Sequence, residues 1–130
     1  MGWKYYKTQK GNKYNNRKVF VDGVQFDSAK EGRRWRELRL MEDAGIIENL
    51  RRQVIYTLIP SQDVMDRKTG KHVKTYRSVT YRADFVYTDN RDGQTIVEDV
   101  KGYKGGTAYA LFKLKKKLML YLFQIEVMEI

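Results

Sequence analysis

The sequence predicts an α/β domain in which a mixed β-sheet lies between helices, in the order helix, three strands, helix and strand. Residues 28–45 and 107–121 show the capping and the apolar spacing of helices. The stretches between and after them are rich in β-branched and aromatic residues, which suit strands. The chain has 130 residues without a repeat or a linker, so we expect residues 19–130 to form one domain.

The composition favours a polyanionic partner. The chain has 26 Lys and Arg against 16 Asp and Glu, so nucleic acid is the first candidate partner and an anionic membrane surface is the second. Structural RNA binding would produce the same charge. The absence of cysteine excludes disulfides and zinc–thiolate sites and favours a cytosolic setting. No apolar run reaches the roughly 18 residues of a membrane-spanning helix, so we expect no membrane partner.

The first 18 residues are basic and contain no acidic residue. Aromatic residues are interleaved with the basic ones and aliphatic residues are few, so we expect an arm that is poorly ordered in isolation. The basic side chains could neutralise phosphates while the aromatic rings stack on exposed bases, but a solubilising tail explains the composition equally well. The basic residues of this arm are Lys4, Lys7, Lys10, Lys13, Arg17 and Lys18.

A hairpin and a helix are predicted after the arm. The pair Asp22-Gly23 separates two short apolar runs, which is typical of a tight hairpin turn. Ser28 is a good N-cap for the helix, and Glu31 follows at the spacing of a capping box. Glu31 also shares a helix face with Trp35. Two roles therefore stay open for Glu31, a helix cap or an inward-facing carboxylate.

Three strands are predicted between the helices. Residues 50–59 are predicted to form a strand, with its apolar residues from Val54 to Ile59, and the only proline, Pro60, ends it. Residues 61–71 are polar and contain a turn at residues 67–70. Residues 73–88 then form one long strand or two short ones.

Asp84 lies within this second strand region. Alternation places it on the face opposite to the one shared by Tyr81, Ala83, Phe85 and Tyr87. A turn at residues 89–93 makes a hairpin with the next strand and brings Asp84 near Asp99. A solvated strand face explains Asp84 equally well.

The stretch from Thr95 to Gly102 is predicted to be a short buried strand that ends in charged residues. Alternation places Asp99 and Lys101 on one face and Glu98 on the other. Charged residues are rarely buried without a partner or a metal, so this strand end is a candidate functional site. The alternative is a strand end that reaches solvent with a local contact between Asp99 and Lys101.

A second helix is predicted from Thr107 to about Tyr121, and residues 125–130 form a final strand. We expect the inward face of this helix to be a stripe of leucines, with lysines covering much of the rest. The predicted inward stripe consists of Leu111, Leu114, Leu118 and Tyr121 or Leu122, and the lysines are Lys113, Lys115, Lys116 and Lys117.

Glu31, Asp84, Asp99 and Lys101 converge in this arrangement. Oxygen donors without cysteine or a nearby histidine suit Mg²⁺ or Mn²⁺. Such a metal makes a nucleophile from water and neutralises charge that builds on a phosphodiester, while Lys101 would polarise the water or pair with the phosphate. The single histidine, His72, stands beside a turn, so a histidine-based triad is not supported.

These residues carry a resemblance. The arrangement resembles the motif of the PD-(D/E)XK nuclease superfamily. That motif has an acid on a leading helix, here Glu31, an Asp on one strand, here Asp84, and an acid-x-Lys on the next strand, here Asp99-Val100-Lys101. The chain is also similar, from about residue 13 onward, to a small phage and prophage family of that superfamily, a domain of unknown function. The segments that carry this likeness are Lys13-Tyr14-Asn15-Asn16, Gly23 to Ser28, Ala83-Asp84-Phe85 and Val97 to Gly102. Ala83 departs from the motif, where proline is common.

The resemblance implies a restriction-endonuclease-like core (α-β-β-β-α-β) and a metal-dependent DNA endonuclease that uses Mg²⁺ or Mn²⁺. Glu31, Asp84, Asp99 and Lys101 would be catalytic. The metal ligands would be Asp84, Asp99 and Glu31, with Glu98 as an alternative acid, together with the backbone carbonyl of Val100. The expected DNA contacts are Lys4, Lys7, Lys10, Lys13, Arg17, Lys18, Arg34, Lys104, Lys113 and Lys116.

Likeness to RecU-type Holliday junction resolvases implies that branched recombination or replication intermediates are the substrates. It also implies a homodimer, encoded by a phage or prophage and acting in the cytoplasm of a bacterial host cell. Two alternatives stay open. One is a non-cleaving nuclease-fold subunit of a recombination, packaging or transposition complex, and the other is a basic RNA-binding or structural protein.

Overall fold

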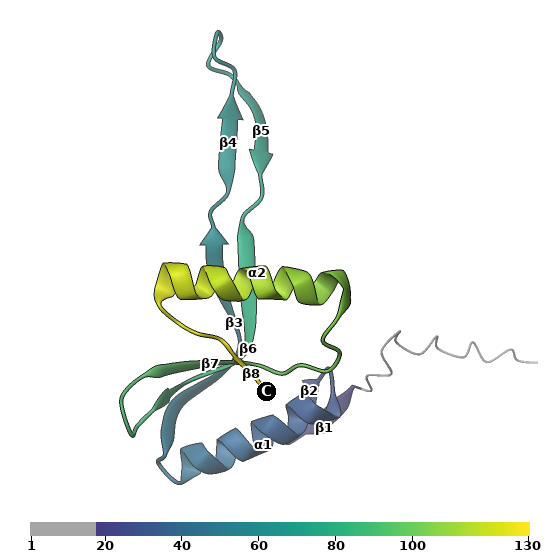
Figure 1. Ribbon diagram of the computed structural model, residues 1–130, viewed down its shortest axis with the longest axis vertical. Helices are drawn as coiled ribbons and strands as arrows, with labels where there is room; N and C mark the ends of the chain where they lie inside the picture. The colour runs from purple at the N-terminus through teal and green to yellow at the C-terminus, as the bar shows by residue number, and fades with distance from the viewer. Residues whose placement is uncertain (1–17) are drawn as a thin grey trace, which may run out of the picture.

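The computed structural model describes residues 18–130 (Figure 1). Residues 1–17, which include most of the predicted basic arm, lie outside the described residues. The elements are β1 (Val19–Val21), β2 (Val24–Phe26), α1 (Ala29–Asp43), β3 (Ile47–Ile59), β4 (Gln62–Met65), β5 (His72–Tyr76), β6 (Val79–Asp89), β7 (Thr95–Asp99), α2 (Gly106–Phe123) and β8 (Met128–Glu129).

The central sheet has four strands in the order β3-β6-β7-β8. The pairs β3–β6 and β6–β7 are antiparallel, whereas β7 and β8 are parallel, so the sheet is mixed. The prediction of a mixed sheet flanked by two helices is confirmed. In Figure 1, α2 crosses β3 and β6 near the base of a ribbon formed by β4 and β5, and α1 lies toward the other end of the sheet.

Each helix packs on its own apolar cluster, and we name the two sides of the sheet the α1 face and the α2 face. The buried cluster on the α1 face consists of Phe26, Leu38, Ile47, Phe85 and Tyr87. The buried cluster on the α2 face consists of Leu58, Tyr81, Ala83, Val86, Val97, Phe112, Met119 and Val127. The middle strands β6 and β7 are therefore covered on both faces, which explains why charged residues within them need partners.

The predicted N-terminal hairpin and first helix are confirmed. Asp22 and Gly23 both have positive φ, 50° and 77°, which a primed hairpin turn requires. Ser28 caps α1, since its hydroxyl accepts the backbone N–H of Glu31 at 3.1 Å. The helix ends at Asp43, and Gly45 follows it with a φ of 75°.

The strand alternation predicted around Asp84 is wrong. Tyr81 and Ala83 lie on the α2 face, whereas Phe85 lies on the α1 face with Tyr87. The neighbouring strand β3 exchanges faces at the same place. Arg52 stacks on Phe26 of the α1 face, whereas Val54 packs against the α2 face.

Gln53 explains this exchange of faces. It has a φ of 53°, in the left-handed region that a regular strand does not use. The register of β3 with β6 pairs Arg52 with Phe85 and Val54 with Ala83, so Gln53 faces Asp84. Both strands thus exchange faces at Gln53 and Asp84, and these two side chains lie where the two faces meet.

The inward stripe predicted for α2 is also wrong. The buried residues of α2 are Phe112 and Met119, whereas Leu111, Leu114 and Tyr121 are 50%, 55% and 79% exposed. Of the predicted stripe, Leu118 packs against the core. Because apolar residues surround most of this helix, the helical spacing fits two different stripes. Phe112 occupies the inward position, where its ring packs on the ring of Tyr81 with the centroids 6.2 Å apart.

The polar region after Pro60 contains a strand that the sequence did not predict. Residues 61–71 include β4, which pairs with β5 in a ribbon that extends from β3 and β6 (Figure 1). Residues 73–88 form two strands rather than one, with β5 beginning at His72 and β6 at Val79. Within residues 18–130, neither helix has the length and apolar character needed to cross a membrane.

Candidate active site

Three elements carry the predicted catalytic residues. Glu31 lies in the first turn of α1, Asp84 lies in β6, and Asp99 ends β7 just before Lys101. The β6–β7 register pairs Phe85 with Glu98, so the next residues outward, Asp84 and Asp99, lie opposite each other. The Val100 N–H donates a hydrogen bond of 2.8 Å to Asp84 Oδ2, which fixes that carboxylate against the end of β7.

Gln53 links Asp84 to Glu31. Its Nε2 atom lies 3.3 Å from Asp84 Oδ1 and 3.4 Å from Glu31 Oε1, so both carboxylates accept from one amide group. These bonds are long, and an amide carries no net charge to balance two carboxylates. The left-handed backbone of Gln53 is what allows its side chain to reach this position, beside the point where the strands exchange faces.

Both linked carboxylates have raised pKa values. Burial raises the pKa of the Glu31 carboxyl to about 7, and the negative charges of Asp84 and Asp27 add to the rise. Burial likewise raises the pKa of Asp84 to about 6, with the charge of Asp99 adding to it. The hydrogen bonds from Val100 and Gln53 lower the pKa of Asp84 without offsetting these effects. Burial thus disfavours the charged forms of both carboxyls, and the nearby cations Arg52 and Lys101 do not offset it.

Asp99 is held by a cation and a hydroxyl. Lys101 Nζ lies 2.7 Å from Asp99 Oδ1, and the Tyr81 hydroxyl donates a hydrogen bond of 2.8 Å to Oδ2. The same ammonium lies 3.4 Å from the centroid of the Phe112 ring, a cation–π contact that holds Lys101 on the α2 face. Lys30 of α1 donates a hydrogen bond of 2.7 Å to the Lys101 carbonyl, so both helices contact this loop.

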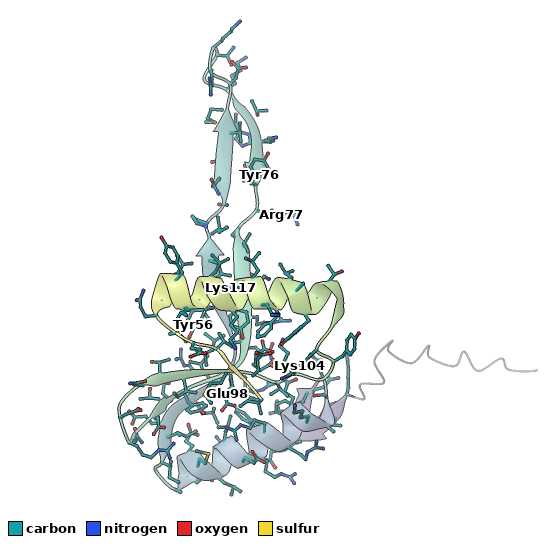
Figure 2. All side chains as sticks on the ribbon, in the orientation of Figure 1. Tyr56, Tyr76, Arg77, Glu98, Lys104 and Lys117 are labelled. Carbon is teal, nitrogen blue, oxygen red and sulfur yellow. The ribbon has the colours of Figure 1, made fainter. Side chains whose placement is uncertain are left out.

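Glu98 lies on the opposite face from Asp99, as predicted from alternation, and Figure 2 shows it between the central sheet and α1. Arg34 donates to both Glu98 oxygens, with 2.8 Å between Nε and Oε2, and the Tyr87 hydroxyl donates to Oε1 at 2.6 Å. The side chain of Glu98 is fully buried, so this pair replaces its water contacts. Both oxygens of Glu98 are thus engaged on the α1 face.

The remaining predicted DNA contacts are divided between engaged and exposed residues. Arg34 is bound to Glu98 and Glu37, and Lys116 Nζ lies 3.0 Å from Glu129 Oε2. The carboxylates hold both cations, which weakens the prediction that these two side chains contact DNA. Lys104 and Lys113 are exposed, as is Lys18. The predicted contacts Lys4, Lys7, Lys10, Lys13 and Arg17 lie outside the described residues.

The predicted metal ligands are brought together in part. Among the described residues 18–130, no three carboxylate or histidine groups are placed to hold a cation as they stand. Asp99 is occupied by Lys101 and Tyr81, whereas Glu31 and Asp84 share the neutral amide of Gln53. The donor set fits Mg²⁺ or Mn²⁺ in its chemistry, because it offers carboxylate oxygens, which are the hard ligands that these cations prefer. The Val100 carbonyl stays a predicted ligand.

Sequence reasoning missed Gln53, Tyr81 and Lys30. Gln53 left a weak signal, since it is a polar residue next to the apolar run that begins at Val54. Tyr81 was predicted only to share a strand face with Ala83, and no sequence pattern connects its hydroxyl to Asp99. Lys30 contacts a loop 71 residues away, which local patterns do not report.

The fold and this cluster define a small α/β protein in which a half-buried carboxylate in the middle of β6 lies beside a buried carboxylate and a lysine at the end of β7. Residues 11–128 match the family model described as "Protein of unknown function (DUF1064)", and the chain belongs to this family. The expectation of membership in a family of unknown function is thereby confirmed. The chain matches no curated protein and no solved structure.

Proposed function

We propose that the protein is a metal-dependent DNA endonuclease with a restriction-endonuclease-like core of the PD-(D/E)XK type. The observation that carries the proposal is the geometry of the buried Glu31 and the half-buried Asp84, whose carboxylates share the neutral amide of Gln53 next to the Asp99–Lys101 pair. Structural ion pairs balance their charges, whereas a site that receives a divalent cation and a phosphate keeps carboxylates unbalanced until they bind.

Each residue has a definable role in this chemistry. Glu31, Asp84 and Asp99 would hold Mg²⁺ or Mn²⁺, and the metal when bound lowers the pKa of water and neutralises charge on the phosphodiester. Lys101 leaves Asp99 to contact the attacking water or the phosphate, guided by its position on the Phe112 ring. Gln53 keeps the Glu31 and Asp84 oxygens turned toward each other.

DNA is the proposed substrate because the chain carries a formal charge of +10 and exposed lysines such as Lys104 lie on the loop next to Lys101. We extend the proposal to branched recombination or replication intermediates by the resemblance to RecU-type resolvases. The resemblance also motivates a homodimer and action in a bacterial host cell.

The test is incubation of the protein with labelled linear, nicked, flap and four-way DNA, with Mg²⁺, with Mn²⁺ and with EDTA. We expect cleavage with either metal, no cleavage in EDTA, and DNA binding without cutting in Ca²⁺. Full cleavage in EDTA would refute the metal mechanism. An absence of cleavage on every substrate with both metals would refute the enzyme.

A second function is favoured by one observation, the engagement of Asp99 by both Lys101 and Tyr81. A site closed in this way suits a nuclease-fold subunit that binds DNA without cutting it. The same incubation separates the two functions, because such a subunit binds DNA in EDTA and in Mg²⁺ alike and leaves every strand intact.

A further inference from the structure

A pocket opens next to the candidate active site, on the loop between β7 and α2. Its volume is about 580 Å³, within the range of small-ligand sites. Lys101 forms part of its lining, so whatever occupies the pocket lies directly next to the proposed reaction centre. The lining residues that matter below are Lys101, Tyr103, Gly105, Ala108 and Tyr109. Figure 2 labels Lys104 on this loop.

Two aromatic side chains form the walls. Tyr109 is anchored, because its ring stacks on Phe112 with centroids 6.0 Å apart and its hydroxyl donates to Glu129 at 2.8 Å. Tyr103 is 67% exposed and lies against Gly105, where an added Cβ would come within 2.7 Å of the ring. Glycine at position 105 therefore lets the Tyr103 ring lie close to the backbone, with most of its surface presented to solvent.

The charge of the pocket restricts its ligand. Lys101, whose ammonium also contacts Asp99, contributes a cation to the lining, and the lining itself contains no acidic residue. A cationic ligand is therefore disfavoured. The aromatic walls favour a planar ligand, and the cation favours a ligand that is attached to phosphate. A nucleobase attached to its phosphate meets this description, since bases stack on aromatic side chains irrespective of sequence.

We infer that this pocket receives the base of one unpaired nucleotide adjoining the phosphate that is cut, with Tyr103 as its stacking platform. The inference rests on the proposed endonuclease function and specifies its substrate class. A base that remains in a duplex stack cannot enter a side pocket, because it must first leave its neighbours and its partner. The preferred substrate is thus DNA with an unpaired nucleotide at the cleavage site, and continuous duplex is a poor one.

The first experiment measures base stacking without cleavage. A duplex with a single bulged 2-aminopurine is bound to the protein in Ca²⁺, and the same duplex with 2-aminopurine paired to thymine is the reference DNA. We expect protein binding to quench the fluorescence of the bulged base at least twofold and to leave the paired base unchanged. Tyr103→Ala should abolish the quenching, and Tyr103→Phe should retain it, since the ring is what stacks.

Matched variants separate the pocket from the rest of the surface. Ala108→Trp places a large side chain in the pocket, whereas Ala110→Trp makes the same change on an exposed position of α2 that does not line it. Tyr121 of α2 is 79% exposed and gives Tyr121→Ala as the control for Tyr103→Ala. We expect only Ala108→Trp and Tyr103→Ala to lose the quenching. Equal quenching in all variants, or none in the unaltered protein, overturns the inference.

The second experiment measures cleavage of the bulged and the continuous duplex in Mg²⁺. We expect the bulged strand to be cut at a phosphate adjoining the bulge, about tenfold faster than the duplex, and Tyr103→Ala to abolish this preference. Cleavage of both DNAs at equal rates refutes the pocket and leaves the endonuclease standing. Quenching that depends on Tyr103 without any cleavage refutes the endonuclease and leaves a base-binding pocket.

Discussion

Glu98 and Asp99 are neighbours in β7, both buried, and they point to opposite faces of one sheet. Glu98 is bound by Arg34 through two hydrogen bonds and by the Tyr87 hydroxyl, so its charge is balanced. Asp99 faces Lys101, but Asp84 and Glu31 lie close by and share a neutral amide. The α1 face therefore holds a carboxylate that is paired with an arginine, whereas the point where the two faces meet holds two carboxylates that share a neutral amide.

This difference separates the acid to which we assign a structural role from the acids that we propose to be functional. Burial alone does not, because Glu98 is fully buried and Asp99 is 7% exposed. The distinction lies in the partners of each acid. Glu98 and Arg34 stabilise each other, and the hydrogen bond to Glu98 raises the pKa of Arg34. Where the two faces meet, the pKa values of Glu31 and Asp84 are raised instead, by burial first and by neighbouring carboxylates second.

The strongest test of this comparison neutralises one of the two carboxylates that share the amide. Asp84→Asn removes a proposed metal ligand, and we expect cleavage to fall about 10³-fold, since several kcal/mol of charge stabilisation depend on the metal. DNA binding in Ca²⁺-free buffer should be retained or tightened, because a negative charge near the phosphate is removed. Strand cleavage and a gel-shift titration measure the two effects, and an active Asp84→Asn would end the comparison.

The second test addresses the balanced face. Glu98→Gln leaves the guanidinium of Arg34 half-buried without its carboxylate, so we expect the free energy of unfolding to fall by about 3 kcal/mol. Urea denaturation followed by circular dichroism measures the change. Glu37→Gln is the matched control, since Glu37 also bonds Arg34 at 2.9 Å but is 62% exposed, and we expect a change under about 0.5 kcal/mol. Equal effects of the two variants would show that Glu98 is no more important than a surface partner.

Much of this arrangement could be predicted from the sequence, because its signals are local. The cap at Ser28, the turn residues and the alternation in β7 placed Glu31 in the first turn of α1 and separated Glu98 from Asp99. The hairpin between β6 and β7 followed from the turn between them, and it predicted that Asp84 and Asp99 lie together. The catalytic roles of these residues stay predictions.

The rest depends on contacts that the sequence does not display. The exchange of faces at Gln53 needs a left-handed residue within a strand, which alternation cannot anticipate. The inward face of α2 was mispredicted because Leu114 and Met119 belong to two apolar stripes of one helix, and only the position of Tyr81 selects between them. A local pattern shows which apolar stripes a helix has, but the residues that pack on the helix determine which stripe is buried.

The third test uses pH to measure the effect of the buried charge of Glu31 directly. The pKa of Glu31 is about 7 in the folded protein against an ordinary value of 4.5 for the carboxyl, so the folded state binds the proton more tightly than the unfolded state. Stability is therefore unaffected by this group below pH about 4.5, falls as the pH rises toward 7, and stays lowered above it. Glu31→Gln removes this effect while keeping an oxygen for Gln53.

In EDTA we therefore expect Glu31→Gln to be more stable than the unaltered protein by about 2 to 3 kcal/mol at pH 8. The two proteins should be equal near pH 4, where both side chains are neutral. Urea denaturation at a series of pH values measures the difference. A variant that is less stable at pH 8 would contradict the interpretation that the buried charge of Glu31 destabilises the folded protein.

The smallest test compares two hydroxyls, one on each face. Tyr87→Phe removes a hydrogen bond to Glu98, and Tyr81→Phe removes one to Asp99. We expect Tyr87→Phe to lower the free energy of unfolding by about 1.5 kcal/mol, as for a buried bond to a charged group, and to leave the metal requirement unchanged. Tyr81→Phe should cost less, about 0.5 to 1 kcal/mol, because the Asp99 side chain is 10% exposed and water can replace the lost hydroxyl, whereas Glu98 is fully buried.

The two variants should separate further when metal is titrated. Loss of the Tyr81 hydroxyl frees one oxygen of Asp99, so Tyr81→Phe should reach half-maximal cleavage at a two- to tenfold lower Mg²⁺ concentration, which corresponds to about 0.4 to 1.4 kcal/mol. Cleavage rates over a series of Mg²⁺ concentrations for both variants measure this shift. If Tyr87→Phe shifted the metal requirement and Tyr81→Phe did not, the face that we assign to metal binding would be the wrong one. The two variants, Tyr81→Phe and Tyr87→Phe, each remove one hydroxyl. Together they test whether Asp99 or Glu98 is the acid that must lose its tyrosine hydrogen bond before a cation can bind.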